Sequence, residues 1–234
     1  MKNHNFGTRL KKFWAGSIIL LVSLSINAQG DVDMIDLSKP RIKGEMSLEE
    51  VLYSRHSVRS YQDRAISLKE LGQILWAGKG VNVDGVSGPT RTAPSAGGLY
   101  PQELYVAAGK VKGIESGIYS YHSDRHALEL MQKGDFRRDL AEAALMQTFI
   151  AEAPASIIIA GVYERSTAKY GKRGETRYVH MDAAHSAQNV FLQVTASGLA
   201  TVTVGAFNDE MVHQIIGSGR AIPLYIMPVG YPVE

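Results

Sequence analysis

The sequence predicts a single α+β domain. Segments with helical periodicity alternate with strand-like segments along the chain, and no stretch repeats another. The 234 residues suit one large domain or two small ones, and a composition of 45% hydrophobic and 21% charged residues is ordinary for a globular protein. Because the sequence contains no cysteine, disulfides, thiolate metal sites and a cysteine nucleophile are excluded.

Residues 1–28 are typical of a secretory signal peptide. Four basic residues precede a charge-free, mostly apolar run over residues 13–26, which is shorter than the roughly 20 residues that span a bilayer. We expect cleavage near Ala28 and an exported protein, periplasmic or secreted, with no membrane association in its mature form. The alternatives are a membrane anchor, if the segment is not cleaved, and a buried helix.

The predicted leader accounts for the basic balance of the chain. Its removal takes away four basic and no acidic residues, which leaves 21 basic and 23 acidic residues in the mature protein. A nucleic-acid-binding domain usually carries a marked basic excess. We therefore expect no nucleic-acid partner.

The first two helices are predicted by their capping boxes. Residues 29–46 form an extended lead-in, after which Ser47 with Glu50 opens one helix and Ser67 with Glu70 opens a second. Gly78 and Gly80 are expected to end the second helix. Residues 81–98, rich in Gly, Pro, Ser and Thr, are expected to form a loop.

The remaining elements follow from hydrophobic pattern and turn residues. The run over residues 155–162 is continuously apolar, as in a buried strand, and 117–121 is expected to pair with 127–131 across a short turn. The other predicted strands are 103–108, 201–204 and 223–229, and the other predicted helices are 136–144, with Asp135 as its cap, 177–197 and 209–216.

Motifs of several common enzyme classes are incomplete. Gly72 to Lys79 resembles a phosphate-binding loop, but its glycine spacing is one residue too long. His180 and His185 are five residues apart, so that they do not share a helix face well, and no metal site is expected.

Two segments are unusual. Residues 55–59 (RHSVR) place two guanidinium groups and a hydroxyl at a helix end, as in anion sites, although a solvated helix end has the same composition. Residues 92–101 (TAPSAGGLYP) form a small-residue loop that a flat ligand could approach closely, although a plain turn is the alternative.

Taken in order with residues 198–207 (GLATVTVGAF) and 228–232 (PVGYP), these segments resemble the FMN-dependent nitroreductase family. The resemblance runs from about residue 47 to residue 232. Residues 169–174 (KYGKRG), followed by Arg177, Tyr178, Asp182, His185 and Asn189, resemble its SagB/ThcOx-type dehydrogenase branch. The resemblance implies the nitroreductase fold, a central and mostly antiparallel sheet flanked by helices, with residues 47–234 as an FMN-binding domain in a homodimer.

The resemblance also implies which residues bind FMN. Residues 55–59 would hold the phosphate, ribityl and pyrimidine end of FMN, and the loop over residues 92–101 would contact FMN from the other subunit. Backbone N–H groups of residues 198–207 would lie near flavin N5 and O4. These residues are Arg55, His56, Ser57 and Arg59; Pro94, Ser95, Ala96 and Gly98; and Gly205 and Ala206. Many family members add a Lys or Arg after the final GYP; here Arg220 or another basic residue is expected to substitute, or FMN binds more weakly.

Lys169 and Tyr170 match a Lys–Tyr pair that is catalytic in azoline oxidation within the resembled branch. Either could move a proton while the flavin moves hydride; the alternative is that both are surface-loop residues. The implied activity on a small-molecule substrate is nitro- or quinone-type reduction or azoline-type oxidation, with NAD(P)H a candidate electron donor. The alternatives are a catalytically inactive exported flavin- or ligand-binding protein and a structural protein without flavin.

Overall fold

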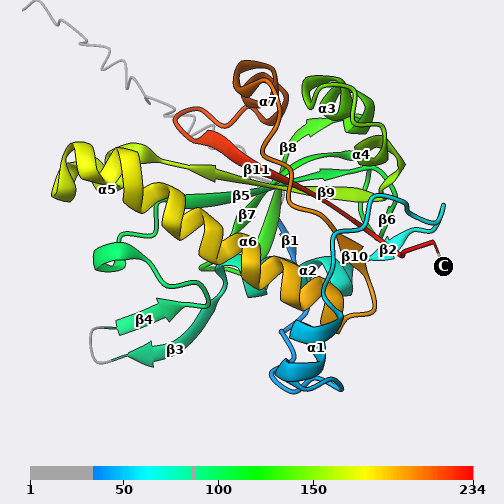
Figure 1. Ribbon diagram of the computed structural model, residues 1–234, viewed down its shortest axis with the longest axis horizontal. Helices are drawn as coiled ribbons and strands as arrows, with labels where there is room; N and C mark the ends of the chain where they lie inside the picture. The colour runs from blue at the N-terminus through cyan, green and yellow to red at the C-terminus, as the bar shows by residue number, and fades with distance from the viewer. Residues whose placement is uncertain (1–33, 86–87, 234) are drawn as a thin grey trace, which may run out of the picture. The chain divides into compact units, whose positions relative to one another are not determined.

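The computed structural model describes residues 34–85 and 88–233, so the predicted signal peptide over residues 1–28 lies outside the described residues. A seven-stranded sheet forms the centre of the fold, and every neighbouring pair in it is antiparallel (Figure 1). The predicted α+β fold with its antiparallel sheet is therefore confirmed. In sheet order the strands are β1 (Met34–Asp36), β8 (Ala127–Lys133), β7 (Gly117–His122), β5 (Gln102–Ala108), β9 (Ala155–Gly161), β11 (Ile222–Gly230) and β10 (Ala200–Thr201).

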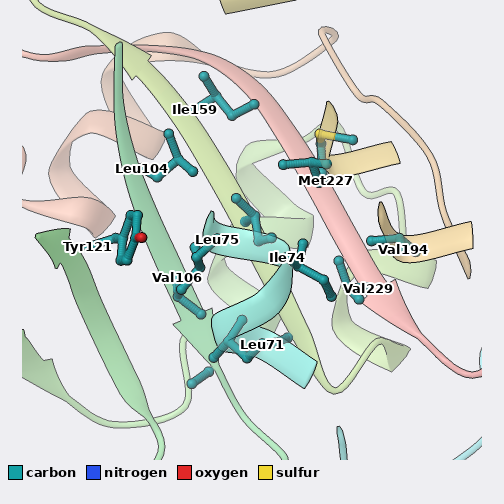
Figure 2. Close-up of a cluster of buried hydrophobic side chains, with 14 of the residues drawn as sticks. Leu71, Ile74, Leu75, Leu104, Val106, Tyr121, Ile159, Val194, Met227 and Val229 are labelled. Atoms are coloured by element: carbon teal, nitrogen blue, oxygen red, sulfur yellow. The ribbon is translucent and has the colours of Figure 1, made fainter. Parts of the chain in front are cut away.

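Helices cover both faces of the sheet. Apolar side chains of α2 (Leu68–Lys79) and α6 (Val179–Ala196) pack on one face, and those of α3 (Arg137–Ala143), α4 (Phe149–Glu152) and α7 (Asp209–Ile216) pack on the other. Figure 2 shows the first core, where Leu71, Ile74 and Leu75 of α2 lie over strand residues such as Val106 and Met227. Because β9 is buried on both faces, its sequence is apolar except at Ser156.

Both predicted capping boxes are present. The Glu50 amide donates to Ser47 Oγ over 3.2 Å and the Ser47 amide donates to Glu50 Oε2 over 2.6 Å, at the start of α1 (Leu48–Ser54). Ser67 and Glu70 repeat the arrangement at the start of α2. These reciprocal bonds satisfy amides that a helix start otherwise leaves unpaired. They position α1, whose end carries the Arg55–Arg59 segment.

The prediction that Gly78 ends the second helix is wrong, since α2 continues to Lys79 and Gly80 is its C-cap. A Cβ on Gly78 would lie 2.8 Å from Leu104 of β5 and 2.9 Å from Val190 of α6. The glycine therefore allows α2 to approach the sheet and α6 closely rather than terminating the helix.

Two further segments differ from the sequence prediction. Residues 81–98 are not all loop: β3 (Val81–Gly85) and β4 (Gly88–Arg91) form an antiparallel hairpin, in which Val81 pairs with Arg91. The backbone ladder between adjacent segments supplies that order, since β4 (GPTR) carries no apolar alternation of its own. The chain between β9 and α6 is helical, as α5 (Tyr163–Tyr170) and a π-helical turn (Gly174–Tyr178).

Smaller elements complete the described chain. β2 (Ile66–Ser67) pairs in parallel with β6 (Val111–Lys112), and Ala96–Gly98 form a single 3₁₀ turn. Over residues 34–85 and 88–233 the helices are all too short or too polar to cross a membrane.

The prediction that Asp135 caps this helix is wrong, because Phe136 is the N-cap of α3 and makes no side-chain cap hydrogen bond there. Asp135 instead pairs with Arg137, and this pair makes part of the fold's stability dependent on acid pH. Asp135 Oδ1 accepts from the Arg137 amide over 3.2 Å and from Arg137 Nε over 2.8 Å, and these bonds hold the pKa of Asp135 below its usual value. A carboxyl with a lowered folded-state pKa stabilises the protein above its unfolded pKa, and this stability is lost as the pH falls through the folded value.

We therefore expect Asp135→Asn to flatten the decline in the free energy of unfolding below about pH 4. Urea unfolding across a series of acid pH values measures that slope. Parallel profiles for the variant and the wild type would contradict the expected contribution of Asp135.

Candidate functional site

The loop around Ser95 is held by a buried carboxylate of α6. Asp182 is 2% exposed, and its Oδ2 accepts from Ser95 Oγ over 2.6 Å while its Oδ1 accepts from the Ala96 amide over 3.2 Å. Ser95 Oγ in turn accepts from the Tyr100 amide over 2.8 Å. One carboxylate thus fixes both the entry to the loop and, through Ser95, its exit.

Two more side chains of the same helix extend this contact. His185 Nδ1 lies 3.2 Å from the Pro94 carbonyl oxygen, and Asn189 Nδ2 donates to the Thr92 carbonyl over 3.0 Å. Since positions 182, 185 and 189 are spaced by three and four residues, they share one face of α6. The loop is therefore positioned by a helix face, not by its own turn geometry alone.

Lys169 and Tyr170 meet this loop at Gly97. Gly97 has a φ of +64° and Gly98 a φ of +67°, a region that favours glycine. A Cβ on Gly97 would lie 2.9 Å from Lys169 Nζ and nearer still to Tyr170 Oη, whereas one on Gly98 would meet no atom within 4 Å. Lys169 and Tyr170 lie in the last turn of α5 and not in a loop, although Lys169 is at the surface as that alternative holds.

The Lys169–Tyr170 pair has a defined surrounding. The Tyr170 ring packs edge-on against Tyr178, with centroids 4.9 Å apart, and Lys169 Nζ lies 5.4 Å from the Tyr170 centroid. Lys169 is exposed and Tyr170 half-buried. An ammonium or a phenol can donate a proton to a molecule lying against Gly97 and Gly98, and the amine or phenolate that remains can accept one.

The Arg55–Arg59 segment follows α1 and crosses the β10 edge of the sheet. The Arg55 guanidinium lies 4.7 Å from the Phe191 ring centroid, and the Val58 amide donates to the Thr201 carbonyl over 3.1 Å. Ser57 and Arg59 are exposed, as is His56, whose Nδ1 lies 2.9 Å from the Ser54 carbonyl oxygen.

Neither guanidinium of this segment is neutralised by a carboxylate. Within the described residues, Arg55 and Arg59 take part in no ion pair. Two unpaired guanidinium groups with a hydroxyl between them in sequence are a suitable donor set for a phosphate.

Gly205 and Ala206 present open backbone. They follow Val204, which bridges Ile226 of β11, and both are exposed. The Ala206 carbonyl accepts from Gln147 Nε2 over 3.0 Å, and a Cβ on Gly205 would meet no atom within 4 Å. A planar group could therefore approach this backbone closely.

One chain does not bring all predicted residues together. Arg55 packs at Phe191 of α6 and Ser95 at Asp182, nine residues earlier, a separation of about 13 Å along the helix axis. No hydrogen bond, ion pair or ring contact joins residues 55–59 to residues 94–98 in the described structure. The predicted set thus forms two half-sites within one chain.

Arg220 does not complete the first half-site within a single chain. It precedes Ile222, which pairs with Gly161 at one end of β11, whereas Thr201 pairs with Val229 at the other end. At about 3.4 Å per residue the two ends lie more than 20 Å apart.

Sequence reasoning missed several residues of this region. The loop motif does not distinguish Gly97 from Gly98, and no residue next to Asp182 in the sequence indicates that it holds Ser95. A partly buried cluster was also missed, in which Glu103 bonds Lys79 Nζ through Oε2 and the exposed Arg165 Nη2 through Oε1, each over 2.5 Å. Burial lowers the pKa of Lys79 although Glu103 opposes the shift. The sequence did not indicate that Lys79 is buried, because a lysine in the last turn of a helix is usually solvated.

Comparison with known proteins assigns the family. The nitroreductase family model matches residues 52–231. A nitroreductase-like protein of Methanocaldococcus jannaschii is 45% identical over 202 residues, which cover 86% of this chain and 99% of that protein. The chain therefore belongs to the nitroreductase family, a family of oxidoreductases.

Other relatives agree on the fold and on the branch. The crystal structure of a nitroreductase-like protein from Ralstonia eutropha superimposes with a TM-score of 0.73 at 28% identity, over 88% of this chain and 92% of that one. The trifolitoxin operon protein TfxC of Rhizobium leguminosarum bv. trifolii is 24% identical over 192 residues, 76% of this chain and 54% of TfxC. This second similarity supports the SagB/ThcOx-type branch.

Proposed function

We propose that the protein is an FMN-dependent oxidoreductase that acts as a homodimer on a small-molecule substrate. The observation that carries the proposal is the meeting of Lys169 Nζ and Tyr170 Oη at Gly97, in a loop fixed by the buried Asp182. A proton-transfer pair at Gly97, next to the open backbone of Gly98, suits a redox site for a flat cofactor.

The residues present fit FMN. Arg55 and Arg59, unpaired within the described chain, offer charge-assisted hydrogen bonds to a phosphate that carries nearly two negative charges. Gly98 and Gly205 have open space where a side chain would start, so a flat ring could lie against either backbone. When bound, FMN supplies a two-electron carrier that accepts and gives hydride at N5.

The chain's own groups would handle the proton. In a reduction, Tyr170 Oη or Lys169 Nζ would donate a proton to the nitro- or quinone-type acceptor; in an oxidation of an azoline-type ring, one of them would accept the proton that leaves the ring. Asp182 positions the loop through Ser95, and the amides of Gly205 and Ala206 would donate to the cofactor.

The homodimer is proposed because one chain offers two half-sites. The 55–59 segment of one copy and the 94–98 loop of another could then enclose a single cofactor. Exposed apolar side chains on α1 support a partner surface beside the first half-site: Leu48 and Leu52 are at least half exposed and Tyr53 is 94% exposed.

Export is proposed from residues 1–28 of the sequence alone. A processed protein that begins near Gln29 is then expected in the extracytoplasmic fraction, and N-terminal sequencing of that material tests it. NAD(P)H is proposed as a candidate donor, to be compared with other reductants.

We expect the purified protein to retain the visible absorbance of flavin after incubation with FMN and desalting. Arg55→Ala/Arg59→Ala is expected to lose the retained band, because each charge-assisted contact to phosphate contributes about 1.5–3 kcal/mol. Arg138→Ala/Lys112→Ala removes two exposed cations elsewhere and serves as the charge-matched control.

Failure of the wild-type protein to retain any flavin would overturn the proposed function. A retained flavin that neither NADH, NADPH nor a chemical reductant reduces would instead favour the catalytically inactive flavin-binding alternative. The oligomeric state, measured by sedimentation with and without FMN, tests the homodimer independently.

A further inference from the structure

A cleft of about 1160 Å³ lies between β5, β7, α5 and the segment before β11. Figure 1 shows α5 and the segment before β11 at the same end of the sheet. Basic side chains dominate the lining of this cleft: Lys79, Arg91, Arg125, Arg165 and Arg220. Three acidic side chains also line it, Glu103, Asp124 and Glu164. The cleft is large enough for a small organic molecule, and its charge balance favours an anion.

Arg91 is the feature of the cleft that points most directly to a ligand. Its side chain is 16% exposed, and its Nη2 bonds Asp124 Oδ1 over 2.6 Å. Its Nη1 is buried and has no hydrogen-bond partner in the described chain. Buried donors are rarely left unpaired, and Arg91 lines the cleft, so Nη1 is a donor beside the cleft that lacks an acceptor.

The acidic residues do not cancel the positive charge. Glu103 is shared between Lys79 and Arg165, one carboxylate oxygen for each, and Asp124, whose side chain is 81% exposed, is held by Arg91. Over the described residues, Arg125 and Arg220 form no ion pair. Two unpaired guanidinium groups therefore accompany the unpartnered Arg91 Nη1.

The other walls of the cleft suit an organic body. Leu99, Val162 and the rings of Tyr100, Tyr105 and Tyr121 line it. An arginine-rich site of this kind matches a carboxylate or phosphate attached to an apolar or aromatic group better than a bare inorganic ion.

The cleft adjoins the candidate active site. Leu99 and Tyr100 follow Gly98 directly, and Tyr100 has a φ of +46°, which is unusual for a residue with a side chain. Arg165 Nη1 donates to the Tyr100 carbonyl over 3.0 Å, and Arg165 lies one helical turn before Lys169 on α5. The loop that contains Gly98 and Tyr100 and the helix α5 thus contribute residues to both the cleft and the candidate active site.

We propose that this cleft is a second binding site, specific for an organic anion that carries a carboxylate or phosphate group. Arg91 Nη1, Arg125 and Arg220 bind the charged group, and the tyrosine walls contact the remainder of the molecule. The assignment of this anion as the charged end of the reacting substrate or donor rests on the proposed oxidoreductase function; the binding site itself does not.

The test is isothermal titration of the full-length protein with three probes: 4-nitrobenzoate, NADPH and the neutral 4-nitrobenzyl alcohol. Saturable binding of 4-nitrobenzoate or NADPH is expected, with a Kd at least about tenfold weaker in Arg125→Gln/Arg220→Gln. The charge-matched Arg138→Gln/Lys112→Gln control is expected to bind the anions with wild-type affinity. The affinity for the neutral alcohol is expected to be the same in the wild type and in both double variants.

Arg91→Lys is a second test that keeps the charge and the reach to Asp124 but removes the Nη1 donor. It is expected to weaken anion binding several-fold, since a lysine lacks the planar fork of a guanidinium. A change that affects the neutral probe equally would show lost packing and count against the proposal.

The outcomes show separately whether the site exists and whether its ligand is a substrate or an electron donor. Dependence on Arg125 and Arg220 for 4-nitrobenzoate assigns the site to a carboxylate-bearing substrate, and the same dependence for NADPH assigns it to a phosphate-bearing donor. No saturable binding of either anion, or equal affinity in the variant, overturns the proposal, as does displacement of the bound anion by FMN. Anion binding without flavin retention would overturn the proposed function alone.

Discussion

Gly97→Ala is expected to lower turnover by about 100-fold or more, because a misplacement of roughly 1 Å at a catalytic group has effects of that size. The added methyl would stand 2.9 Å from Lys169 Nζ and nearer to Tyr170 Oη, so both side chains must move away from the loop. Steady-state kinetics with the acceptor found by a quinone and nitroaromatic screen measures the effect.

A matched variant separates the clash from backbone strain. Gly198→Ala has nearly the same φ, +69° against +64°, and meets no atom within 4 Å. Both variants are expected to lose about 1–2 kcal/mol of stability for adopting the left-handed region, and only Gly97→Ala is expected to lose turnover. Equal activity in the two variants would show that Lys169 and Tyr170 do not act at this loop.

The sequence was most informative where a local rule and the tertiary structure act in the same direction. Ser47 and Ser67 begin helices because their hydroxyls satisfy backbone amides of the first turn, a contact complete within four residues. The β9 run was recognisable because burial on both faces favours apolar residues, which fill this strand except at Ser156. The β7–β8 pair was predictable because a short turn joins two strands of matching pattern.

The structure departs from the prediction where order comes from the backbone or from distant contacts. The hairpin of β3 and β4 is held by backbone pairing and by a hydrogen bond from Thr90 to Asn82, and β4 (GPTR) has no hydrophobic alternation that would mark it as a strand. Helix α5 has Ser166 as its buried residue, and no apolar stripe marks it as a helix. Gly78 resembles a helix stop in sequence, and only the positions of Leu104 and Val190 explain it as a close contact.

The resemblance predicted which segments form the candidate site, but it did not predict the contacts that hold these segments in place. Motif order indicated the 55–59 and 94–98 segments and the Lys169–Tyr170 pair. The sequence could not show that Asp182 bonds Ser95, 87 positions away, because such a contact depends on how α6 crosses the sheet. The sequence likewise could not show that Glu103 forms ion pairs with Lys79 and Arg165, which lie on two separate helices.

Asp182→Ala is expected to destabilise the protein by about 3 kcal/mol and to abolish flavin retention. Removal of the carboxylate leaves the half-buried Ser95 hydroxyl and Ala96 amide without their acceptor, and the cost of an unsatisfied donor is about 1–3 kcal/mol when it is fully buried. The loop is then released from α6, and the surface that it presents to a cofactor is lost. Urea unfolding and FMN retention measure the two effects.

Two controls define what the carboxylate contributes. Asp182→Asn keeps one acceptor oxygen of nearly the same shape and is expected to lose less stability than Asp182→Ala. Gln188→Ala, on the exposed side of the same helix, is expected to change neither stability nor flavin retention. If Asp182→Ala unfolds at the same urea concentration as Gln188→Ala, the loop is held by its own turn, and the position of Gly97 beneath Lys169 and Tyr170 does not depend on α6.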